Sequence, residues 1–343
     1  MTSYVWGGED TQHFYSLTPD NVLNAIESLG VKTTGRVMQL NSMENRVYEI
    51  EVNLDQEPDN PSENFLILKF YRPGRWTKNQ IQDEHDFIWD LLDQEIQAIA
   101  PIKYNGETIF TSEENLFFSI FPKKGGRAAD EWNDGLLEQM GRLLARLHNI
   151  GDAKKSEHRI HLNVNTYGRQ NLDYLLKNDI VPKEYRQSYE SVVNQICDLS
   201  EPLFKGIHVQ RVHGDCHHGN TILGATGPFL IDFDDMVNAP RVQDIWLITP
   251  GRDEYSLRQR DVLIDAYLGM ADFDFKELKL IESLRALRII HFTAWIANRY
   301  EDESFKRAFH SFNTHQYWEK EVFDLRQQVL HIQDAVDSLN YSY

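Results

Sequence analysis

The pattern of hydrophobic and polar positions changes character near residue 122. Before this point, short runs rich in β-branched and aromatic residues predict strands: residues 36–52 contain two runs around a polar turn, and NFLILKFY (64–71) forms a third. After it, apolar residues recur at steps of three and four, as over residues 136–147, which predicts amphipathic helices. The chain therefore begins with a strand-rich part and continues with a helical one.

These patterns predict an α+β fold with two lobes, a small β-rich lobe over residues 1–121 and a larger helical lobe over residues 122–343. The longest apolar segment, residues 280–300, contains several charged residues, so we expect a buried or half-buried helix and not a membrane span. Three of its large apolar residues recur at helical spacing and are expected to pack in the core; they are Phe292, Trp295 and Ile296.

Composition restricts the partners of the chain. Its formal net charge is −18, which disfavours nucleic acid and anionic lipid surfaces and would attract a cationic small molecule or a basic protein segment, although it is also a common solubility feature. The first ten residues carry no secretory signal, and Cys197 and Cys216 are too few for a disulfide framework. We expect a cytoplasmic monomer without nucleic acid or membrane partners.

A lysine and a glutamate in the first lobe predict a buried ion pair. Strand alternation places Lys69 on the same face as Ile67 and Tyr71, and an isolated lysine there could simply extend to solvent. Thr77 begins the next helix, and Glu84 falls within the buried stripe of that helix, where a charge needs a counter-charge. Together, Lys69 and Glu84 match the ion pair with which kinases orient a lysine against nucleotide phosphates.

The stretch VHGDCHHGN (212–220) supports two kinds of chemistry. Its three histidines with Asp215 could bind a metal, but adjacent histidines point in different directions on most backbones, and no later stretch supplies matching ligands. In the phosphoryl-transfer reading, Asp215 accepts the proton of the attacking hydroxyl and Asn220, five positions later, reaches a magnesium ion. Gly214 and Gly219 give this loop the freedom to bend tightly.

A second acidic stretch follows in PFLIDFDD (228–235). A short apolar strand ends at Asp232, where a carboxylate can bridge a magnesium ion and nucleotide phosphates. Asp234 and Asp235 lie further along the turn, and we interpret them as solvated carboxylates or as partners of basic groups such as Arg241.

Several motifs together carry a family resemblance. HGDCHHGN with IDFDD resembles the H-x-D-x-x-x-x-N and I-D signatures of the aminoglycoside phosphotransferase-like branch of the protein-kinase fold, and LARLH (144–148) is typical of a helix in that branch. LNSMENRVYEI, LKFYRPGRWT and PRVQDIWLI resemble a cytoplasmic bacterial Ser/Thr protein kinase family of the stress response. The similarity runs from about residue 14 to the last helices. It implies that Asp215 and Asp232 are the catalytic aspartates, with Asn220 and Asp232 as magnesium ligands.

The same resemblance implies ATP as phosphoryl donor, Mg²⁺ as cofactor and a protein bearing Ser or Thr as acceptor. Ser42 then belongs to the loop over ATP, although this loop lacks the G-x-G-x-x-G of ordinary protein kinases, and Lys69, held by Glu84, contacts the phosphates. Asp244 either orders the catalytic loop or only caps a turn. Cys216 is interpreted as a packing residue, with a redox role as the alternative. Two other functions remain open: a kinase for an aminoglycoside, choline-like or homoserine-like alcohol, and a nucleotide-binding pseudokinase scaffold.

Overall fold

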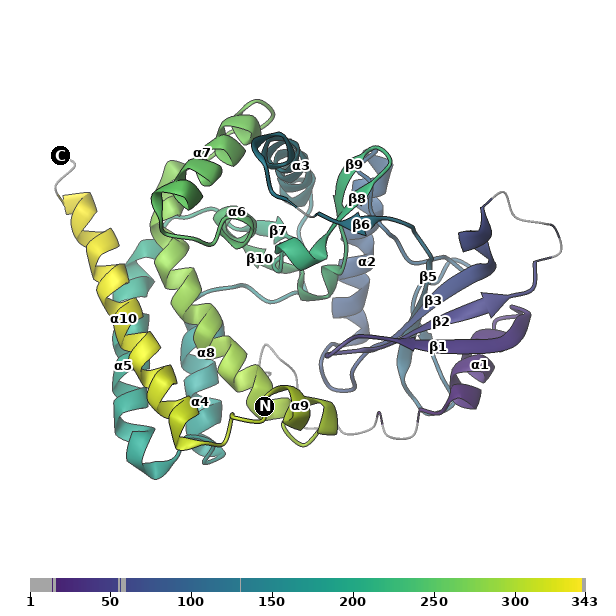
Figure 1. Cartoon of the computed structure of the whole chain (residues 1–343), viewed down its shortest axis with the longest axis horizontal. Coiled ribbons are helices and arrows are strands. Elements are labelled where there is room, and N and C mark those ends of the chain that lie inside the picture. Colours follow the sequence, from purple (N-terminus) through teal and green to yellow (C-terminus); the bar gives the residue numbers. More distant parts are fainter. Residues whose placement is uncertain (1–13, 15–16, 55, 57–59, 130, 341–343) are drawn as a thin grey trace.

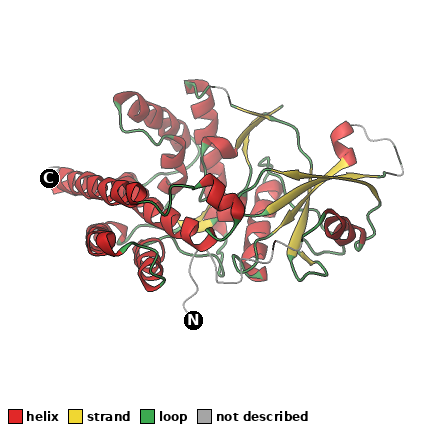
Figure 2. Ribbon diagram, turned by 60° about the horizontal axis from the view of Figure 1, so that its bottom comes forward, coloured by secondary structure: helices red, strands yellow, loops and turns green. Residues whose placement is uncertain are grey.

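The computed structural model describes residues 14, 17–54, 56, 60–129 and 131–340. Figures 1 and 2 show two lobes, one dominated by strands and one by helices, so the predicted two-lobed α+β fold is confirmed. The N-terminal stretch in which we found no secretory signal lies outside the described residues.

The first lobe is built on an antiparallel sheet of five strands. Its elements are α1 (Pro19–Glu27), β1 (Thr33–Leu40), β2 (Arg46–Val52), β3 (Phe65–Phe70), β4 (Phe110–Thr111) and β5 (Phe117–Pro122), and the strand order is β1-β2-β3-β5-β4. The strands predicted over residues 36–52 and 64–71 are confirmed, because β1 and β2 form a hairpin and β3 pairs with β2. Apolar side chains of α1 pack with those of the sheet to form the core of this lobe.

Helix α2 (Lys78–Asp93) lies between the sheet and the helical lobe (Figure 1). The predicted helix start is confirmed, because the Thr77 hydroxyl accepts from the Gln80 amide and the Gln80 side chain accepts from the Thr77 amide. Phe87 and Leu91 of this helix are buried in the core of the helical lobe. The boundary between residues 121 and 122 therefore stays a prediction, since α2 precedes it and packs against the second lobe.

The second lobe consists mainly of helices, with two small sheets near the first lobe. Its elements are β6 (Arg127–Ala128), α3 (Asp134–Ala153), α4 (Gln170–Lys177), α5 (Lys183–Phe204), β7 (Gln210–Val212), β8 (Thr221–Gly224), β9 (Gly227–Leu230), β10 (Val237–Ala239), α6 (Val242–Ile248), α7 (Glu254–Leu268), α8 (Ile281–Arg299), α9 (Glu303–Ala308) and α10 (His315–Asn340). β7 pairs with β10, and β8 pairs with β6 and β9. α3 packs along α7, and α5 packs along α10 (Figure 1).

Helix α8 confirms the buried or half-buried helix predicted over residues 280–300, but one detail of that prediction is wrong. Ile296 is buried in the core, whereas the Phe292 side chain is 45% exposed and Trp295 is only partly buried. Helical spacing places the three residues on one face, and that face turns partly toward a cavity instead of the core. No helix of the described residues is long and apolar enough to cross a bilayer.

Candidate active site

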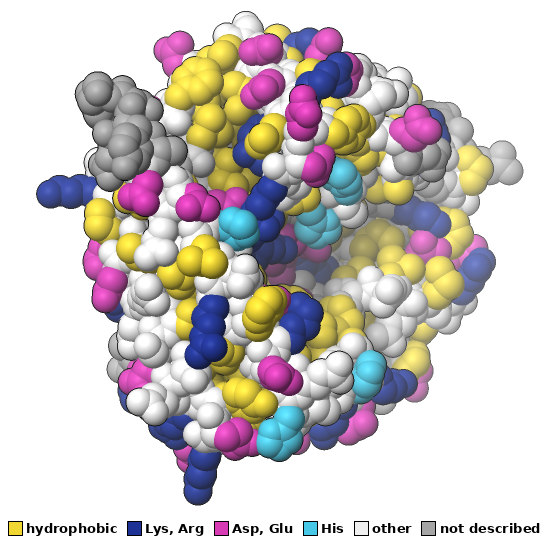
Figure 3. Space-filling model, turned by 60° about the vertical axis from the view of Figure 1, so that its left-hand side comes forward, with side chains coloured by type: hydrophobic (Ala, Val, Ile, Leu, Met, Phe, Trp, Pro, Cys, Tyr) yellow, Lys and Arg dark blue, Asp and Glu magenta, His cyan; other side chains and the backbone are white. Residues whose placement is uncertain are grey.

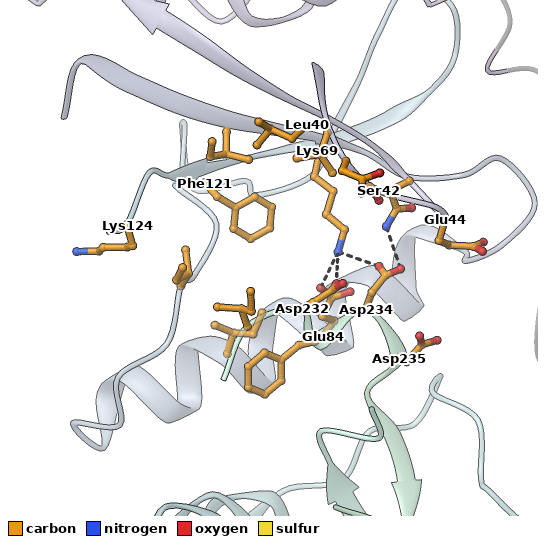
Figure 4. A pocket seen from close by; sticks show the side chains of 18 of the residues that line it. Leu40, Ser42, Glu44, Lys69, Glu84, Phe121, Lys124, Asp232, Asp234 and Asp235 are labelled. Atoms are coloured by element: carbon orange, nitrogen blue, oxygen red, sulfur yellow. Dashed lines mark hydrogen bonds and ion pairs between the residues drawn. The ribbon is translucent and has the colours of Figure 1, made fainter. Parts of the chain in front are cut away.

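A cavity of about 590 Å³ opens between the two lobes, within the usual range of about 300 to 1,000 Å³ for small-molecule sites. The molecular surface is hollowed near the middle of the face in Figure 3, where Lys, Arg, His and acidic side chains gather. The cavity has an apolar part and a charged part (Figure 4). The apolar part is lined by Leu40, Val47, Ile67, Phe121 and Leu230, and the charged part by Lys69, Glu84, Asp232 and Asp234. The apolar part suits an aromatic ring, whereas the charged part, with one lysine and three carboxylates, suits anionic groups only together with a cation.

Lys69 is the central cation of the charged part. It projects from β3 toward three carboxylates (Figure 4): its Nζ lies 3.6 Å from Glu84 Oε1, 3.7 Å from Asp232 Oδ1 and 2.9 Å from Asp234 Oδ1. The predicted contact with Glu84 is therefore present, but Asp234 is the nearest carboxylate. Burial works against the charged lysine, yet Asp234 and Glu84 raise the pKa of Lys69 well above its ordinary value. Lys69 is thus a charged group directed into the cavity.

Of the two interpretations of Asp234, the solvated turn carboxylate is wrong, whereas the partner of a basic group is right, with Lys69 as that group and not Arg241. Asp234 is only 4% exposed, and its Oδ2 accepts a hydrogen bond of 2.9 Å from Asn45 Nδ2. Asp235 pairs with a basic group, but the partner is the buried Arg75. Arg241 instead donates to the side chain of Gln210. The sequence could not show this arrangement because the partners come from segments more than a hundred residues earlier.

Glu84 has a second cationic partner that sequence reasoning missed. Arg159 Nη2 lies 2.9 Å from Glu84 Oε2, and Arg159 Nη1 donates to the backbone carbonyl of Asp234 at 2.7 Å. Both side chains of this ion pair are almost completely buried. Glu84 is consequently fixed between two cations, and Arg159 connects α2 to the segment that carries Asp234.

Asp244 of α6 orders the catalytic loop, which decides between the two roles considered for it. Its fully buried carboxylate accepts from the backbone amides of His213 at 2.9 Å and Gly214 at 2.8 Å, and it lies 3.1 Å from His148 Nε2. Gly214 has φ of +86°, and a Cβ there would lie 2.2 Å from the carbonyl oxygen of Asp235. A side chain at position 214 would therefore disturb the loop that presents Asp215.

Asp215 faces two basic side chains. Arg288 Nη2 of α8 donates to Asp215 Oδ1 at 2.8 Å, and His217 Nε2 lies 3.3 Å from Asp215 Oδ2. Burial opposes ionisation, but His217 and Arg288 together hold the pKa of Asp215 well below its usual range. Asn220 Nδ2 donates to the backbone carbonyl of Asp215 at 3.0 Å, so the two ends of the predicted loop lie together.

The three histidines of the loop do not converge on one point. His213 Nε2 contacts the carbonyl of Ile231 at 3.0 Å, and His218 Nε2 contacts the carbonyl of Ile248 at 2.8 Å. His217 is engaged by Asp215. Because each imidazole has a different partner, the arrangement does not fit the histidine-metal alternative.

Cys216 is completely buried within the apolar core of the helical lobe. Desolvation raises the pKa of its thiol well above the ordinary value. A reactive cysteine needs exposure and a lowered pKa, so this environment fits the packing role.

Asn220 and Asp232 provide oxygen donors of the type that Mg²⁺ prefers. The backbone amide of Ile231 donates to the carbonyl of Asn220 at 2.9 Å, which ties the catalytic loop to the end of β9. Asp232 has φ of +62°, and its side chain is 57% exposed at the cavity. Among the described residues, no group of three or more His, Cys, Asp or Glu side chains could hold a metal alone. To complete the ligand set of a magnesium ion, Asn220 and Asp232 would need oxygen atoms from nucleotide phosphates.

The loop between β1 and β2, residues 41–45, lines the cavity without a glycine. Arg72 holds its backbone: Nε donates to the Glu44 carbonyl at 2.8 Å and Nη2 to the Met43 carbonyl at 3.2 Å. The Asn45 side chain accepts from the Arg72 amide at 3.1 Å. Ser42 lies in this loop at the cavity, where the sequence places it (Figure 4). Arginine contacts thus fix the position of the loop.

Glu44 links this loop to the helical lobe. Its carboxylate accepts from Trp295 Nε1 at 2.6 Å and from Arg299 Nη2 at 2.6 Å, both on α8. Arg75 Nε is a further 3.9 Å neighbour. Burial opposes ionisation, but Arg299 and Arg75 lower the pKa of Glu44 from 4.5 to about 2. The loop over the cavity is therefore held against the second lobe by a partly buried ionic contact.

Replacing this carboxylate is expected to weaken the contact between the lobes. Glu44→Gln removes the carboxylate that Arg299 and Arg75 share, and it should lower the free energy of unfolding by roughly 3 kcal/mol and raise KM for ATP. Because folding lowers the pKa of Glu44, its contribution is complete above pH 4.5 and is lost as the pH falls toward 2. The free energy of unfolding of both proteins is measured in urea at several pH values. The difference between the variant and the unchanged protein should become smaller below about pH 5.

Glu51→Gln is the matched control, because Glu51 makes a 3.9 Å contact with a largely exposed arginine. This substitution should change the free energy of unfolding by less than about 1 kcal/mol at every pH. Equal effects of the two substitutions at neutral pH would contradict the role given to Glu44.

Comparisons with known proteins match this chain to phosphotransferases and kinases. The model of the phosphotransferase enzyme family matches residues 37–281. Stress response kinase A of Escherichia coli strain K12 is 32% identical over 331 residues, covering 96% of this chain and 98% of that protein. Serine/threonine protein kinase RdoA of Salmonella typhimurium strain LT2 is 31% identical over 93% of this chain and 95% of that protein. A solved structure of the amicoumacin kinase hAmiN, in complex with AMP-PNP, Ca²⁺ and Ami, shares the fold with a TM-score of 0.66 and 20% identity, covering 88% of this chain and 93% of that one.

Proposed function

Because the chain belongs to the phosphotransferase enzyme family, we propose that it is a cytoplasmic, magnesium-dependent Ser/Thr protein kinase that uses ATP. The observation that carries this proposal is the match over nearly the whole chain to relatives named stress response kinase A and serine/threonine protein kinase RdoA. Those names also support a role in a bacterial stress response.

The contacts in the cavity support separate roles for the residues that line it. The apolar part receives the adenine ring, while Ser42 and Lys69 hold the phosphates and Glu84 positions the lysine. Asn220 and Asp232 hold magnesium, which neutralises charge on the phosphates. Binding and positioning account for most of the catalysis in such a site.

Asp215 is the proposed proton acceptor. The acceptor hydroxyl transfers its proton to the Asp215 carboxylate while its oxygen forms a bond to the γ-phosphorus. The bond between that phosphorus and the bridging oxygen of ADP breaks, and its electrons remain on ADP. The lowered pKa of Asp215 keeps its carboxylate ionised at neutral pH.

Among the small-alcohol alternatives, an aminoglycoside kinase is less well supported by the space beside Asp215, whereas this space does not separate a Ser or Thr side chain from a choline-like or homoserine-like alcohol. A second cavity there measures about 160 Å³, below the range of about 300 to 1,000 Å³ typical of pockets for drug-sized ligands. An aminoglycoside would need more room, whereas a serine or threonine side chain with its neighbours fits. A pseudokinase would ordinarily have lost one of Lys69, Glu84, Asp215, Asn220 and Asp232, and all five are present.

Incubation with γ-labelled ATP and magnesium tests the proposed function. A generic protein substrate, or the kinase itself, is expected to be labelled on Ser or Thr, with an Asp215→Asn variant as blank. Aminoglycosides, choline and homoserine are included in parallel. Label that appears only in a small alcohol contradicts the protein-kinase proposal, and tight ATP binding without any label favours the scaffold.

A further inference from the structure

The second cavity adjoins the nucleotide cavity, because Asp235 and Trp295 line both. Asp215 lies in its wall, so an acceptor group must reach the site from this side. The remaining walls come from α8, from the short helix Val164–Arg169 and from the segment after β3. They include Arg75, Tyr167, Arg288, His291 and Phe292. Phe292 and Trp295, which we expected in the core, are thus acceptor-side residues.

Two arginine–aspartate pairs dominate the charge of this cavity. Arg288 Nη2 contacts Asp215 Oδ1 at 2.8 Å, and Arg75 pairs with Asp235. Arg75 is only 5% exposed, and its Nε and Nη1 make no hydrogen bond to any part of the chain that the structure describes. The Arg288 side chain is 42% exposed and can therefore rotate. The cavity offers one fixed guanidinium with unused donors and one movable guanidinium.

The contact of Arg288 with Asp215 conflicts with the role of Asp215 as proton acceptor. Arg288 holds Oδ1, and His217 lies at 3.3 Å from Oδ2, so a hydroxyl must displace one of them. A displaced guanidinium gains most from another carboxylate, because Arg–carboxylate hydrogen bonds are charge-assisted. A cationic acceptor offers no such carboxylate, and the displaced Arg288 would repel it.

Building on the proposed function, we propose that Arg288 and Arg75 select a protein segment with an acidic side chain beside the phosphorylated Ser or Thr. In this exchange Arg288 leaves Asp215 for the acidic side chain of the substrate, and the hydroxyl takes the vacated Oδ1. Arg75 uses Nη1, which makes no hydrogen bond among the described residues, to hold the same segment. The net charge of −18 does not oppose this, since distant surface charges are screened beyond about 8 Å at physiological ionic strength.

Steady-state kinetics with MgATP and three peptide substrates test this inference. The peptides have equal length and one serine each, and this serine is flanked by Asp/Glu, by Gln/Ala or by Lys/Arg. The unchanged enzyme should have a kcat/KM at least about tenfold higher for the acidic peptide than for the neutral one, and lowest for the basic one. Arg288→Gln should remove this preference by lowering the ratio of kcat/KM for the acidic peptide to kcat/KM for the basic peptide about tenfold or more. Arg288→Lys should retain part of the preference, and KM for ATP should not change.

Arg285→Gln is the matched control on the same helix, because Arg285 donates to the carbonyl of Pro250 and lines neither cavity. Its peptide preference should equal that of the unchanged enzyme. Phosphorylation of all three peptides with equal efficiency, or a preference that survives Arg288→Gln, overturns the inference and leaves the protein-kinase proposal standing. Label only in a small alcohol overturns both.

Discussion

Asp215→Asn is expected to reduce phosphoryl transfer by roughly 100- to 10,000-fold, the usual cost of losing a general base. The amide can still accept from Arg288, and the bond from Asn220 goes to the backbone of residue 215, so the loop should keep its shape. ATP affinity should therefore be unchanged. Turnover of γ-labelled ATP together with an ATP titration separates these two quantities.

Asp232→Ala should lose activity by a different route. Removing a proposed magnesium ligand should weaken nucleotide binding in the presence of magnesium and have little effect in its absence. Asp265→Asn, an exposed carboxylate of α7, is the control and should behave as the unchanged enzyme. Full turnover by either site variant would refute the assignment of that residue.

Lys69→Met and Glu84→Gln are each expected to lower activity by roughly 100-fold, as expected when a preorganised group that stabilises transferring charge is lost. If Glu84 acts through Lys69, the double variant should lose much less than the product of the two effects. Coupling should remain incomplete, because Lys69 also contacts Asp234 at 2.9 Å and Glu84 also contacts Arg159 at 2.9 Å. The coupling energy between Lys69 and Glu84 is obtained from the initial rates of the unchanged enzyme, the two single variants and the double variant at saturating MgATP.

Stability must be measured on the same variants, since removing one partner of a buried pair typically costs about 3 to 5 kcal/mol. Rates should be taken well below each unfolding midpoint. The pair Lys78 and Glu107 is the matched control: it is 3.7 Å apart with both side chains more than half exposed. The same substitutions there should cost less than about 1 kcal/mol and leave activity intact. Independent, multiplicative losses at Lys69 and Glu84 would mean that Glu84 does not act through Lys69.

Local sequence determined the elements and several individual positions. The hydrophobic pattern predicted the strands over residues 36–52 and 64–71, because alternation follows from the geometry of a strand. Thr77 marked the start of α2, and helical spacing placed Glu84 in its buried stripe. The contact between Lys69 and Glu84 was also predictable, because a buried carboxylate needs a cation, and a lysine on a strand with a glutamate on the following helix matches the ion pair of kinases.

The tertiary structure alone decided which polar and charged side chains from distant segments contact each other. Arg159 with Glu84, Asn45 with Asp234 and Arg288 with Asp215 join residues that are 75, 189 and 73 positions apart. No local pattern marks the partner in such a pair: helical spacing predicted that Glu84 is buried but not that Arg159 meets it, and the other residues by themselves satisfy the rules for a solvated polar side chain. The same reason explains the error at Phe292: periodicity defines a helix face, but only the packing of the surrounding elements decides whether that face meets the core or a cavity.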